Sequence, residues 1–324
     1  METIYFGGGT PSLLSKSEIS SLLSKIYKVH QVASKPEITL EANPDDLSKK
    51  KLAELKDTLI NRLSIGIQSF FEADLQFMNR AHTAKEALHC IRAAQDAGFS
   101  NLTIDLIYGT PTTTNAMWEE NIRTALSLNI PHVSAYCLTV EPNTALAHFV
   151  KTEKAPPVNE EKAAQQFEVL INCLKSAGYE HYEISNFALP EQYARHNSNY
   201  WLGEKYLGIG PSAHSFDGCS RQWNVAHNRQ YIRAINSNQP YFEKEVIDTK
   251  TRYNEYILTG MRTKWGCDLE KIEHIGGDSF KQHFIKNVQP YLNQQLVRQK
   301  NNNFTLTDTG KLLADRIAME LFKD

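Results

Sequence analysis

The feature that most constrains the fold is a regular alternation of short β-rich runs and helical patterns through the first half of the chain. Each β-rich run ends in polar or Gly/Pro residues, and apolar residues at helical spacing follow it. Strands joined by crossover helices form parallel sheets, and ligand sites lie at the C-terminal ends of such strands. The pattern therefore predicts an α/β fold that is a β/α barrel or an arc of one. A doubly wound open sheet is the alternative.

The predicted elements follow one another at fairly even intervals. Strands are expected over residues 3–6, 38–42, 62–67, 102–107 and 132–138. Helices are expected over residues 16–30, from 48 onwards, 72–79, 84–97, 115–128 and 160–177. A series of strand–helix units of this kind places every strand end, and the polar residues found there, at one mouth of the barrel.

The pattern changes at about residue 245. Helices are expected over 251–262 and 269–275, then a short hairpin around Asn301–Asn303, and a closing helix over 308–322. This order predicts a small winged-helix-like domain. The chain is therefore divided into a partial barrel (1–180), a connecting segment (181–244) and a C-terminal domain (245–324).

Charge and hydropathy limit the class of partner. The formal net charge of -2 provides no basic field for nucleic acid, and only Arg298 and Lys300 beside the predicted hairpin turn would support a nucleic-acid interface. We therefore expect no nucleic-acid partner. No apolar run approaches the roughly 20 residues of a membrane-spanning helix, and no signal peptide opens the sequence. We expect a soluble, cytoplasmic protein.

The five cysteines are widely spaced. They are Cys90, Cys137, Cys173, Cys219 and Cys267. An odd number in a chain of this length argues against a secreted disulfide framework, and no C-x-x-C or C-x-x-x-C-x-x-C spacing of an iron–sulfur site occurs. We expect reduced thiols and no metal bound by cysteine on this chain.

Polar residues follow or end the predicted strands. Gly7–Gly9 follows the first strand, where it forms either a tight turn or a loop that lets a ligand approach the backbone. Glu41, Gln68 and Asp105 lie at later strand ends, and Arg80 lies in the connection after the third strand. Each alone could be a surface residue or a helix cap. Together they suit a small ligand with hydroxyls, an amine and a carboxylate.

Ordered motifs extend this pattern along the whole chain. They are YFGGGTPS (5–12), EANP (41–44), SIGIQSF (64–70), DLIYG (105–109), LTVEPNT (138–144), YEISNFA (182–188) and GIGPSAHS (208–215). With them the chain resembles the radical-SAM proteins related to oxygen-independent coproporphyrinogen III dehydrogenase. The resemblance implies a (β/α)6-type radical-SAM barrel.

The resemblance also implies which residues bind S-adenosylmethionine. Gly8, Gly9, Thr10 and Glu41 would contact it. Gln68, Arg80 and Asp105 would line the same mouth, where relatives of the dehydrogenase type hold a second such molecule. No residue is assigned a catalytic role.

A second motif separates two branches of the family. His196 opens HNxxYW (196–201), which marks the heme-chaperone branch, and a neutral imidazole is a common axial ligand of heme iron. The resemblance therefore implies His196 as a heme contact. The alternative is a hydrogen-bonded histidine that packs against Tyr200 and Trp201.

One family element is not found in this sequence. Members carry a C-x-x-x-C-x-x-C strand, whose thiolates hold a 4Fe-4S cluster, on the N-terminal side of the glycine run, and here only Met1–Phe6 precede that run. We expect the first strand–helix unit to be missing and the cluster to belong to the full-length protein. A truncated sequence explains this better than a loss of the chemistry, because the glycine loop and Glu41 are kept.

Two functions follow from the resemblance. The first is a chaperone that receives heme and passes it to acceptor hemoproteins, with any contact to the membrane made through a partner. The second is an enzyme, the oxygen-independent coproporphyrinogen III dehydrogenase of porphyrin biosynthesis. The HNxxYW motif favours the chaperone.

Overall fold

The computed structural model describes the whole chain, residues 1–324. Its backbone forms two compact units, Met1–His196 and Asn197–Asp324. The boundary lies within helix α8 (Arg195–Leu202). The three-part division with boundaries near residues 180 and 244 stays a prediction. No helix of either unit combines the length and the apolar composition that crossing a membrane requires.

The first unit is built on one seven-stranded sheet in the order β1-β2-β3-β4-β5-β7-β6. Its strands are β1 (Thr3–Phe6), β2 (Glu37–Ala42), β3 (Arg62–Gln68), β4 (Leu102–Tyr108), β5 (His132–Cys137), β6 (Glu180–Glu183) and β7 (Asn186–Ala188). β1 to β5 are parallel neighbours in chain order, and β7 runs antiparallel to both of its neighbours. A doubly wound sheet needs a reversal of strand order, which does not occur between β1 and β5. The predicted arc of a β/α barrel is confirmed.

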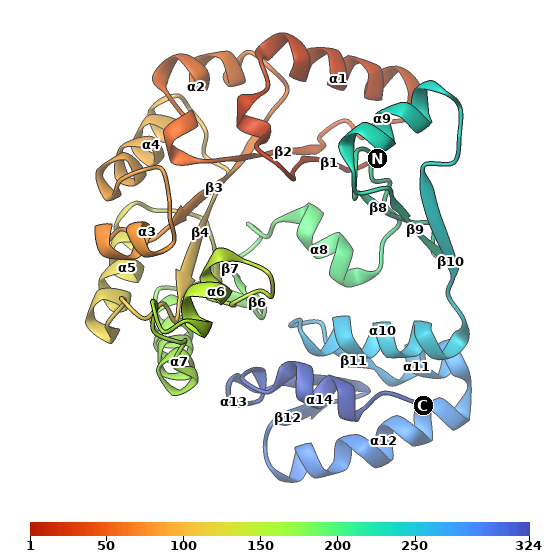
Figure 1. Ribbon diagram of the computed structural model, residues 1–324. Helices are drawn as coiled ribbons and strands as arrows, with labels where there is room; N and C mark the ends of the chain where they lie inside the picture. Colours follow the sequence, from red (N-terminus) through yellow and green to blue (C-terminus); the bar gives the residue numbers. More distant parts are fainter. The chain divides into compact units, whose positions relative to one another are not determined.

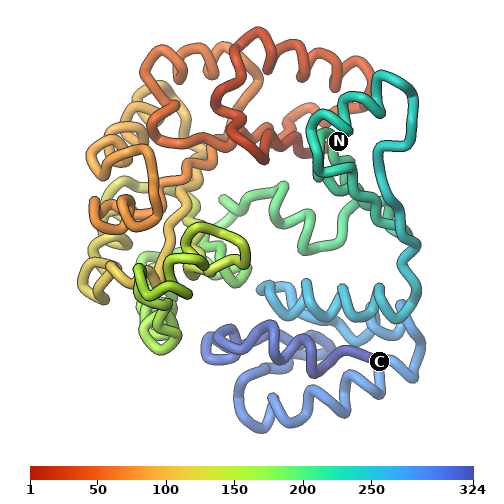
Figure 2. The backbone as a smooth tube through the Cα atoms, viewed as in Figure 1, coloured from red at the N-terminus to blue at the C-terminus, as the bar shows by residue number.

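Helices cover the outer face of this curved sheet (Figure 1). The helices and 3-10 turns of the unit are α1 (Lys16–Val29), α2 (Lys49–Lys56), α3 (Glu72–Phe77), α4 (Ala84–Asp96), α5 (Asn115–Ser127), α6 (Ala145–Lys151), α7 (Glu160–Ser176), η1 (Pro11–Leu13) and η2 (Pro44–Asp46). Figure 2 traces the same arc from red at β1 through orange and yellow to green at β6 and β7.

Side chains on each strand alternate between the two faces of the sheet. On β2, Ile38 and Leu40 point outward and are buried beneath helices, whereas Glu37, Thr39 and Glu41 point to the inner face. The neighbouring strands repeat this pattern of an apolar outer row and a polar inner row. The outer row supplies the hydrophobic core, and the inner row holds the polar side chains that the fold can offer to a ligand.

Two of the helices begin with capping boxes. Ser15 accepts a hydrogen bond from the backbone of Glu18 while the Glu18 side chain accepts one from Ser15, and Thr83 and Glu86 make the same pair at α4. Each box satisfies backbone N–H groups that the first helical turn leaves open. The sequence thereby fixes where α1 and α4 begin.

The second unit contains two three-stranded antiparallel sheets, in the orders β10-β9-β8 and β11-β13-β12. Its strands are β8 (His214–Phe216), β9 (Ser220–Asn224), β10 (Phe242–Val246), β11 (Cys267–Asp268), β12 (Val297–Lys300) and β13 (Asn303–Leu306). Its remaining helices are α9 (Asn228–Asn236), α10 (Thr249–Met261), α11 (Leu269–Gly276), α12 (Asp278–Asn293), α13 (Asp308–Lys311) and α14 (Ala314–Glu320). The β11-β13-β12 sheet and helices α10 to α14 form the small C-terminal domain.

The predicted closing helix over 308–322 is wrong in one respect, because it is two helices, α13 and α14. Leu313, with φ -115° and ψ 20°, leaves the helical region between them. Gly310 lies so close to the carbonyl of Leu296 that a side chain there would overlap it, and Thr307 N–H donates to the same carbonyl at 2.9 Å. The turn of α13 is therefore held against the chain before β12, and the helix restarts at Ala314.

Candidate functional site

The glycine loop after β1 has the conformation that only glycine adopts easily. Gly8 and Gly9 have φ values of 74° and 63°, in the left-handed region. A side chain on Gly7 would meet the Tyr5 ring at 2.6 Å and the Glu41 carboxyl carbon at 3.3 Å. The loop therefore packs against the inner face of β1 and β2 and exposes its backbone N–H groups beside a carboxylate.

Glu41 is the residue that the loop surrounds. Its Oε1 accepts a hydrogen bond from the Tyr5 hydroxyl at 2.6 Å, and its Oε2 accepts one from Gly8 N–H at 3.2 Å. Thr10 ends the loop and precedes η1, and its side chain does not cap that turn. Four residues were predicted to contact S-adenosylmethionine. Two of them, Gly8 and Glu41, are hydrogen-bonded to each other, and the other two, Gly9 and Thr10, continue the same loop.

Gln68 and Arg80 meet at the end of β3. Gln68 has a φ of 65°, and Ser69 N–H donates to Ile67 C=O at 2.8 Å, which makes a tight γ-turn with strained backbone. A Cβ on Gly66 would lie 2.9 Å from Gln68 Nε2 and 3.5 Å from an Arg80 guanidinium nitrogen. The two side chains therefore converge over the one strand position that has no side chain.

The Arg80 guanidinium is only partly satisfied. It donates to Asn43 Oδ1 at 2.8 Å, and its buried Nε has no hydrogen-bond partner. An unpaired buried donor beside the strand ends is the feature expected where a carboxylate or hydroxyl binds.

Asp105 lies on the inner face of β4. Burial first, and then repulsion from the Glu41 carboxylate, raise its pKa to about 7, against the opposing effects of a Ser134 hydrogen bond and the charges of Arg62 and Arg80. The neutral and ionised forms of Asp105 are therefore both available near neutral pH. The site combines the Glu41 carboxyl, an Asp105 carboxyl whose pKa is raised, and a guanidinium, which suits a ligand that carries both positive and negative groups.

A buried carboxylate that the sequence analysis missed supports these strand ends. Asp74, fully buried on α3, accepts hydrogen bonds from Ser69 at 2.8 Å and from Thr112 at 2.6 Å. Ser69 directly follows Gln68, and Thr112 follows the end of β4. Asp74 thereby ties the turn that carries Gln68 to the loop after β4. A lone Asp in an amphipathic helix pattern gave no sign of this role.

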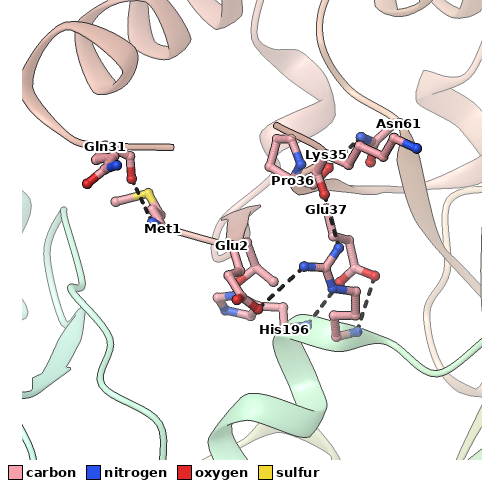
Figure 3. A network of polar contacts seen from close by, with 10 residues as sticks. Met1, Glu2, Gln31, Lys35, Pro36, Glu37, Asn61 and His196 are labelled. Carbon is pink, nitrogen blue, oxygen red and sulfur yellow. Dashed lines mark hydrogen bonds and ion pairs between the residues drawn. The ribbon is translucent and has the colours of Figure 1, made fainter. Parts of the chain in front are cut away.

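The candidate heme residue His196 lies at the start of α8, and the first unit holds it on three sides. Glu37 Oε1 accepts from His196 N–H at 3.0 Å and Glu37 Oε2 from Arg195 N–H at 3.1 Å, so this carboxylate caps the helix (Figure 3). Thr3 Oγ1 and His196 Nδ1 are 2.8 Å apart. The Tyr5 ring stacks on the imidazole, with centroids 4.7 Å apart and planes 16° apart. His196 is an oriented imidazole at the inner face of β1.

Further contacts of the segment before β2 hold α8 to the first unit. Arg195 also donates to Lys35 C=O at 3.1 Å and pairs with Glu2 at 3.5 Å, and Asn61 donates to Pro36 C=O at 2.8 Å (Figure 3). The segment before β2 is therefore bonded both to α8 and to the residue before β3.

Burial, which outweighs the attraction of Glu37, lowers the pKa of the His196 imidazole below its ordinary value of 6.5. The ring is therefore neutral at pH 7, as a metal ligand must be. The predicted alternative placed His196 against Tyr200 and Trp201. In the structure the His196 ring stacks on Tyr5. The ring centroids of Tyr200 and Tyr206 are 4.5 Å apart, and the Arg262 guanidinium carbon lies 5.3 Å from the centroid of the Trp201 ring.

Sequence reasoning missed Thr3, Tyr5 and Glu37 as parts of the site. A signal for them was present in the alternation of each strand. Tyr5 lies two residues after Thr3, and Glu37 lies four residues before Glu41, so all four belong to inner-face positions of β1 and β2. An acidic residue at the start of a buried strand was the strongest available sign.

A row of buried, hydrogen-bonded polar side chains lies on the inner face of the sheet. Arg62 donates to Thr103, Thr103 Oγ1 lies 3.2 Å from His132 Nδ1, and His132 Nε2 lies 2.7 Å from the Tyr182 hydroxyl. Burial lowers the pKa of both Arg62 and His132, and their partners satisfy the groups that burial would otherwise leave open. This row of hydrogen bonds joins β3, β4, β5 and β6.

The cysteines do not form a metal site. Cys90 and Cys267 are buried, Cys137 and Cys219 are exposed, and no three His, Cys, Asp or Glu side chains gather to hold a metal ion. The residues of this chain therefore do not fit a 4Fe-4S cluster. The strand ends of β1 to β4 do fit S-adenosylmethionine, because backbone N–H groups, carboxylates and an under-satisfied guanidinium face one region.

Comparison with protein families identifies two matching regions. Residues 1–125 match the radical SAM superfamily, and residues 247–313 match the HemN C-terminal domain. The first region contains β1 to β4 with the four predicted S-adenosylmethionine contacts and the three residues predicted to line the same mouth, and the second falls within the small C-terminal domain.

Similar proteins extend the match to the whole chain. The heme chaperone HemW of Lactococcus lactis subsp. lactis is 34% identical over 324 residues, all of this chain and 85% of that protein. The heme chaperone HemW of Bacillus subtilis is 33% identical over 319 residues, 98% of this chain and 84% of that protein. Among solved structures, the coproporphyrinogen III oxidase HemN of Escherichia coli, a radical SAM enzyme, gives a TM-score of 0.84 at 22% identity and covers 100% of this chain and 78% of its own. That last similarity shows the shared fold alone.

Proposed function

The chain belongs to the HemW heme-chaperone family of radical-SAM proteins, and from this membership we propose that it binds heme and passes it to acceptor hemoproteins. The observation that carries the proposal is 34% identity to a heme chaperone along the entire chain. The likeness to a coproporphyrinogen III oxidase is one of fold, at 22% identity. The dehydrogenase alternative has no comparable support.

His196 is the proposed heme contact. Its ring is neutral at pH 7 because burial lowers its pKa, and its orientation is fixed by Thr3, Tyr5 and Glu37. A neutral, oriented imidazole loses little conformational freedom when it ligates iron. These properties support a role in heme binding.

The strand ends of β1 to β4 are the proposed site for S-adenosylmethionine, which would supply a sulfonium with adenosyl and methionyl groups. Gly8, Gly9 and Thr10 would approach it with the loop backbone, and Glu41 would accept from its hydroxyls or ammonium. Gln68, Arg80 and Asp105 would line the same mouth, with Arg80 placed to bind a carboxylate through its unpaired Nε. A 4Fe-4S cluster, which membership of the radical SAM superfamily implies, stays a prediction.

Cytoplasmic location, transfer of heme to acceptor hemoproteins and contact with the membrane through a partner also stay predictions.

Heme binding is tested by titrating the purified chain with hemin and recording the Soret band. We expect a shifted band in the wild type and a weaker shift with His196→Ala, with hemin affinity reduced about tenfold or more because the axial ligand is lost. Exposed histidines also bind hemin weakly, so the matched control is His89→Ala on the exposed side of α4, which we expect to behave as the wild type.

Two outcomes would contradict the proposal at different points. An identical spectrum and affinity in His196→Ala would remove His196 from the heme site and leave the family function. A wild-type chain whose Soret band stays that of free hemin would remove heme binding altogether.

A further inference from the structure

Two of the proposed sites are joined by a single side chain. The Tyr5 ring stacks on His196, and the Tyr5 hydroxyl donates to Glu41 Oε1 at 2.6 Å. The other oxygen of the same carboxylate accepts from Gly8 N–H in the glycine loop. Tyr5 therefore has one end on the proposed heme ligand and the other on the proposed S-adenosylmethionine site.

Tyr5 is 37% exposed, and its ring lies against the glycine loop on one side and the imidazole on another. Gly7 carries no side chain where one would meet the Tyr5 ring at 2.6 Å and the Glu41 carboxyl at 3.3 Å. Thr3 holds the imidazole from the same strand, at 2.8 Å from Nδ1. A shift of the Tyr5 side chain would break its stacking on His196 or its hydrogen bond to Glu41, because the same side chain makes both contacts.

The direction of the hydroxyl bond is settled by the chemistry of the pair. The Tyr5 hydroxyl donates to Glu41 Oε1, because a carboxylate oxygen can only accept. A ligand whose hydroxyl or ammonium group donates to Glu41 competes with the Tyr5 hydroxyl for this carboxylate. The Tyr5 hydroxyl then loses or re-aims its bond, and the stacked ring moves with it.

We propose that Tyr5 is a positioning residue that couples Glu41 to His196, so that a ligand binding at the glycine loop changes the affinity of His196 for heme. The heme part of this inference rests on the proposed function. By linkage, heme at His196 changes the affinity for that ligand by the same factor. The ligand class is one that offers hydroxyl or ammonium donors to a carboxylate, as S-adenosylmethionine does.

The first test uses the NMR signal of the His196 ring in the full chain with 13C-labelled histidine. His196→Gln assigns the signal among the eleven histidines. We expect Glu41→Gln to displace the His196 signal when Tyr5 is present and not when Tyr5→Phe is also made, since that change keeps the stacked ring and removes the hydroxyl. A direct electrostatic effect of Glu41 would survive Tyr5→Phe, so an equal displacement in that background would overturn the proposal.

Tyr27→Phe is the matched control for this cycle. Tyr27 is exposed on α1, so the effect of Glu41→Gln on the His196 signal should be unchanged in its presence. The other histidine signals report whether each variant keeps its fold.

The second test measures hemin affinity in the same four proteins. We expect Glu41→Gln to change the hemin dissociation constant by about fivefold or more with Tyr5 in place, and the change to vanish with Tyr5→Phe. S-adenosylmethionine, at a concentration that calorimetry shows to be saturating, should move the wild-type His196 signal. A signal unmoved at saturation would overturn the coupling between the two sites.

The outcomes separate this inference from the function on which it rests. A chain that does not bind hemin refutes the proposed function, while the NMR cycle still decides whether Tyr5 links Glu41 to His196. A chain that does not bind S-adenosylmethionine refutes the assignment of that ligand, and the Glu41→Gln cycle again decides the role of Tyr5.

Discussion

At the scale of single residues, the inner face of the sheet concentrates charge that burial makes sensitive to pH. Asp105 is the clearest case, because its pKa of about 7 lies above the ordinary value of 3.8. A carboxyl whose pKa is raised by folding binds its proton more tightly in the folded state. It therefore favours the folded state at low pH, and this contribution is lost as the pH rises from about 4 through about 7.

Asp105→Asn should stabilise the chain at alkaline pH. The amide keeps the shape of the side chain and removes the penalty of a buried charge beside Glu41, so we expect a gain on the order of 2 kcal/mol at pH 8 that disappears toward pH 4. Urea unfolding of the wild type and the variant across this pH range measures the difference. Asp96→Asn, on the exposed end of α4, serves as control, and a gain independent of pH would contradict the assigned cause.

At the scale of elements, α8 is held to the sheet by its first turn. A helix N-terminus carries a partial positive charge and N–H groups without partners in the helix. The Glu37 carboxylate stabilises this charge and accepts hydrogen bonds from the backbone N–H groups of Arg195 and His196. The cap comes from a strand far away in the sequence. The orientation of His196 therefore depends on β2 as much as on the HNxxYW motif.

Glu37→Gln should loosen the start of α8. One amide oxygen replaces two charged acceptors, so we expect the first turn of α8 to lose about 1–2 kcal/mol of stability. The backbone amides of Arg195 and His196 should then exchange with solvent about tenfold faster. Hydrogen exchange read by mass spectrometry on the peptide that contains α8 measures this. Glu2→Gln removes only an exposed ion pair with Arg195 and should leave the exchange unchanged. Equal effects of the two substitutions would show that capping by Glu37 is unimportant.

At the scale of the whole molecule, each of the two units has its own core. In the second unit, Phe284 of α12 is fully buried and packs edge-on against Phe304 of β13, with centroids 5.1 Å apart. In the first unit, Leu40 and Ile65 are fully buried on the outer rows of neighbouring strands. The substitution of a core residue should therefore act mainly within its own unit.

Phe284→Ala should destabilise the second unit by about 3–5 kcal/mol through the cavity that it leaves. We expect faster hydrogen exchange in α12 and β13, with exchange in β2, β3 and β4 nearly unchanged. Phe242→Ala on the exposed edge strand β10 is the control and should have little effect on either. Equally faster exchange in β2 to β4 would show that the two units unfold together.

Much of the first unit could be predicted because its signals are local. Apolar residues at alternating or helical spacing, capping boxes and Gly/Pro punctuation place β1 to β5 and their helices within about two residues of the observed bounds. The closing helix was predicted as one element because nothing near Gly310 indicates that Leu296 packs against it. Helices α6, α8, α9 and α12 and strands β6 to β11 were not predicted.

The sequence by itself determined the arc of parallel strands, the glycine loop and the polar residues at the strand ends, because each depends on spacing within a short stretch of chain. Only the tertiary structure decided which of these residues meet. Tyr5 reaches both Glu41 and His196, and Glu37 caps a helix that begins at Arg195, because the sheet brings β1, β2 and α8 together. Contacts between residues so far apart along the chain depend on the packing of whole elements, which no local pattern encodes.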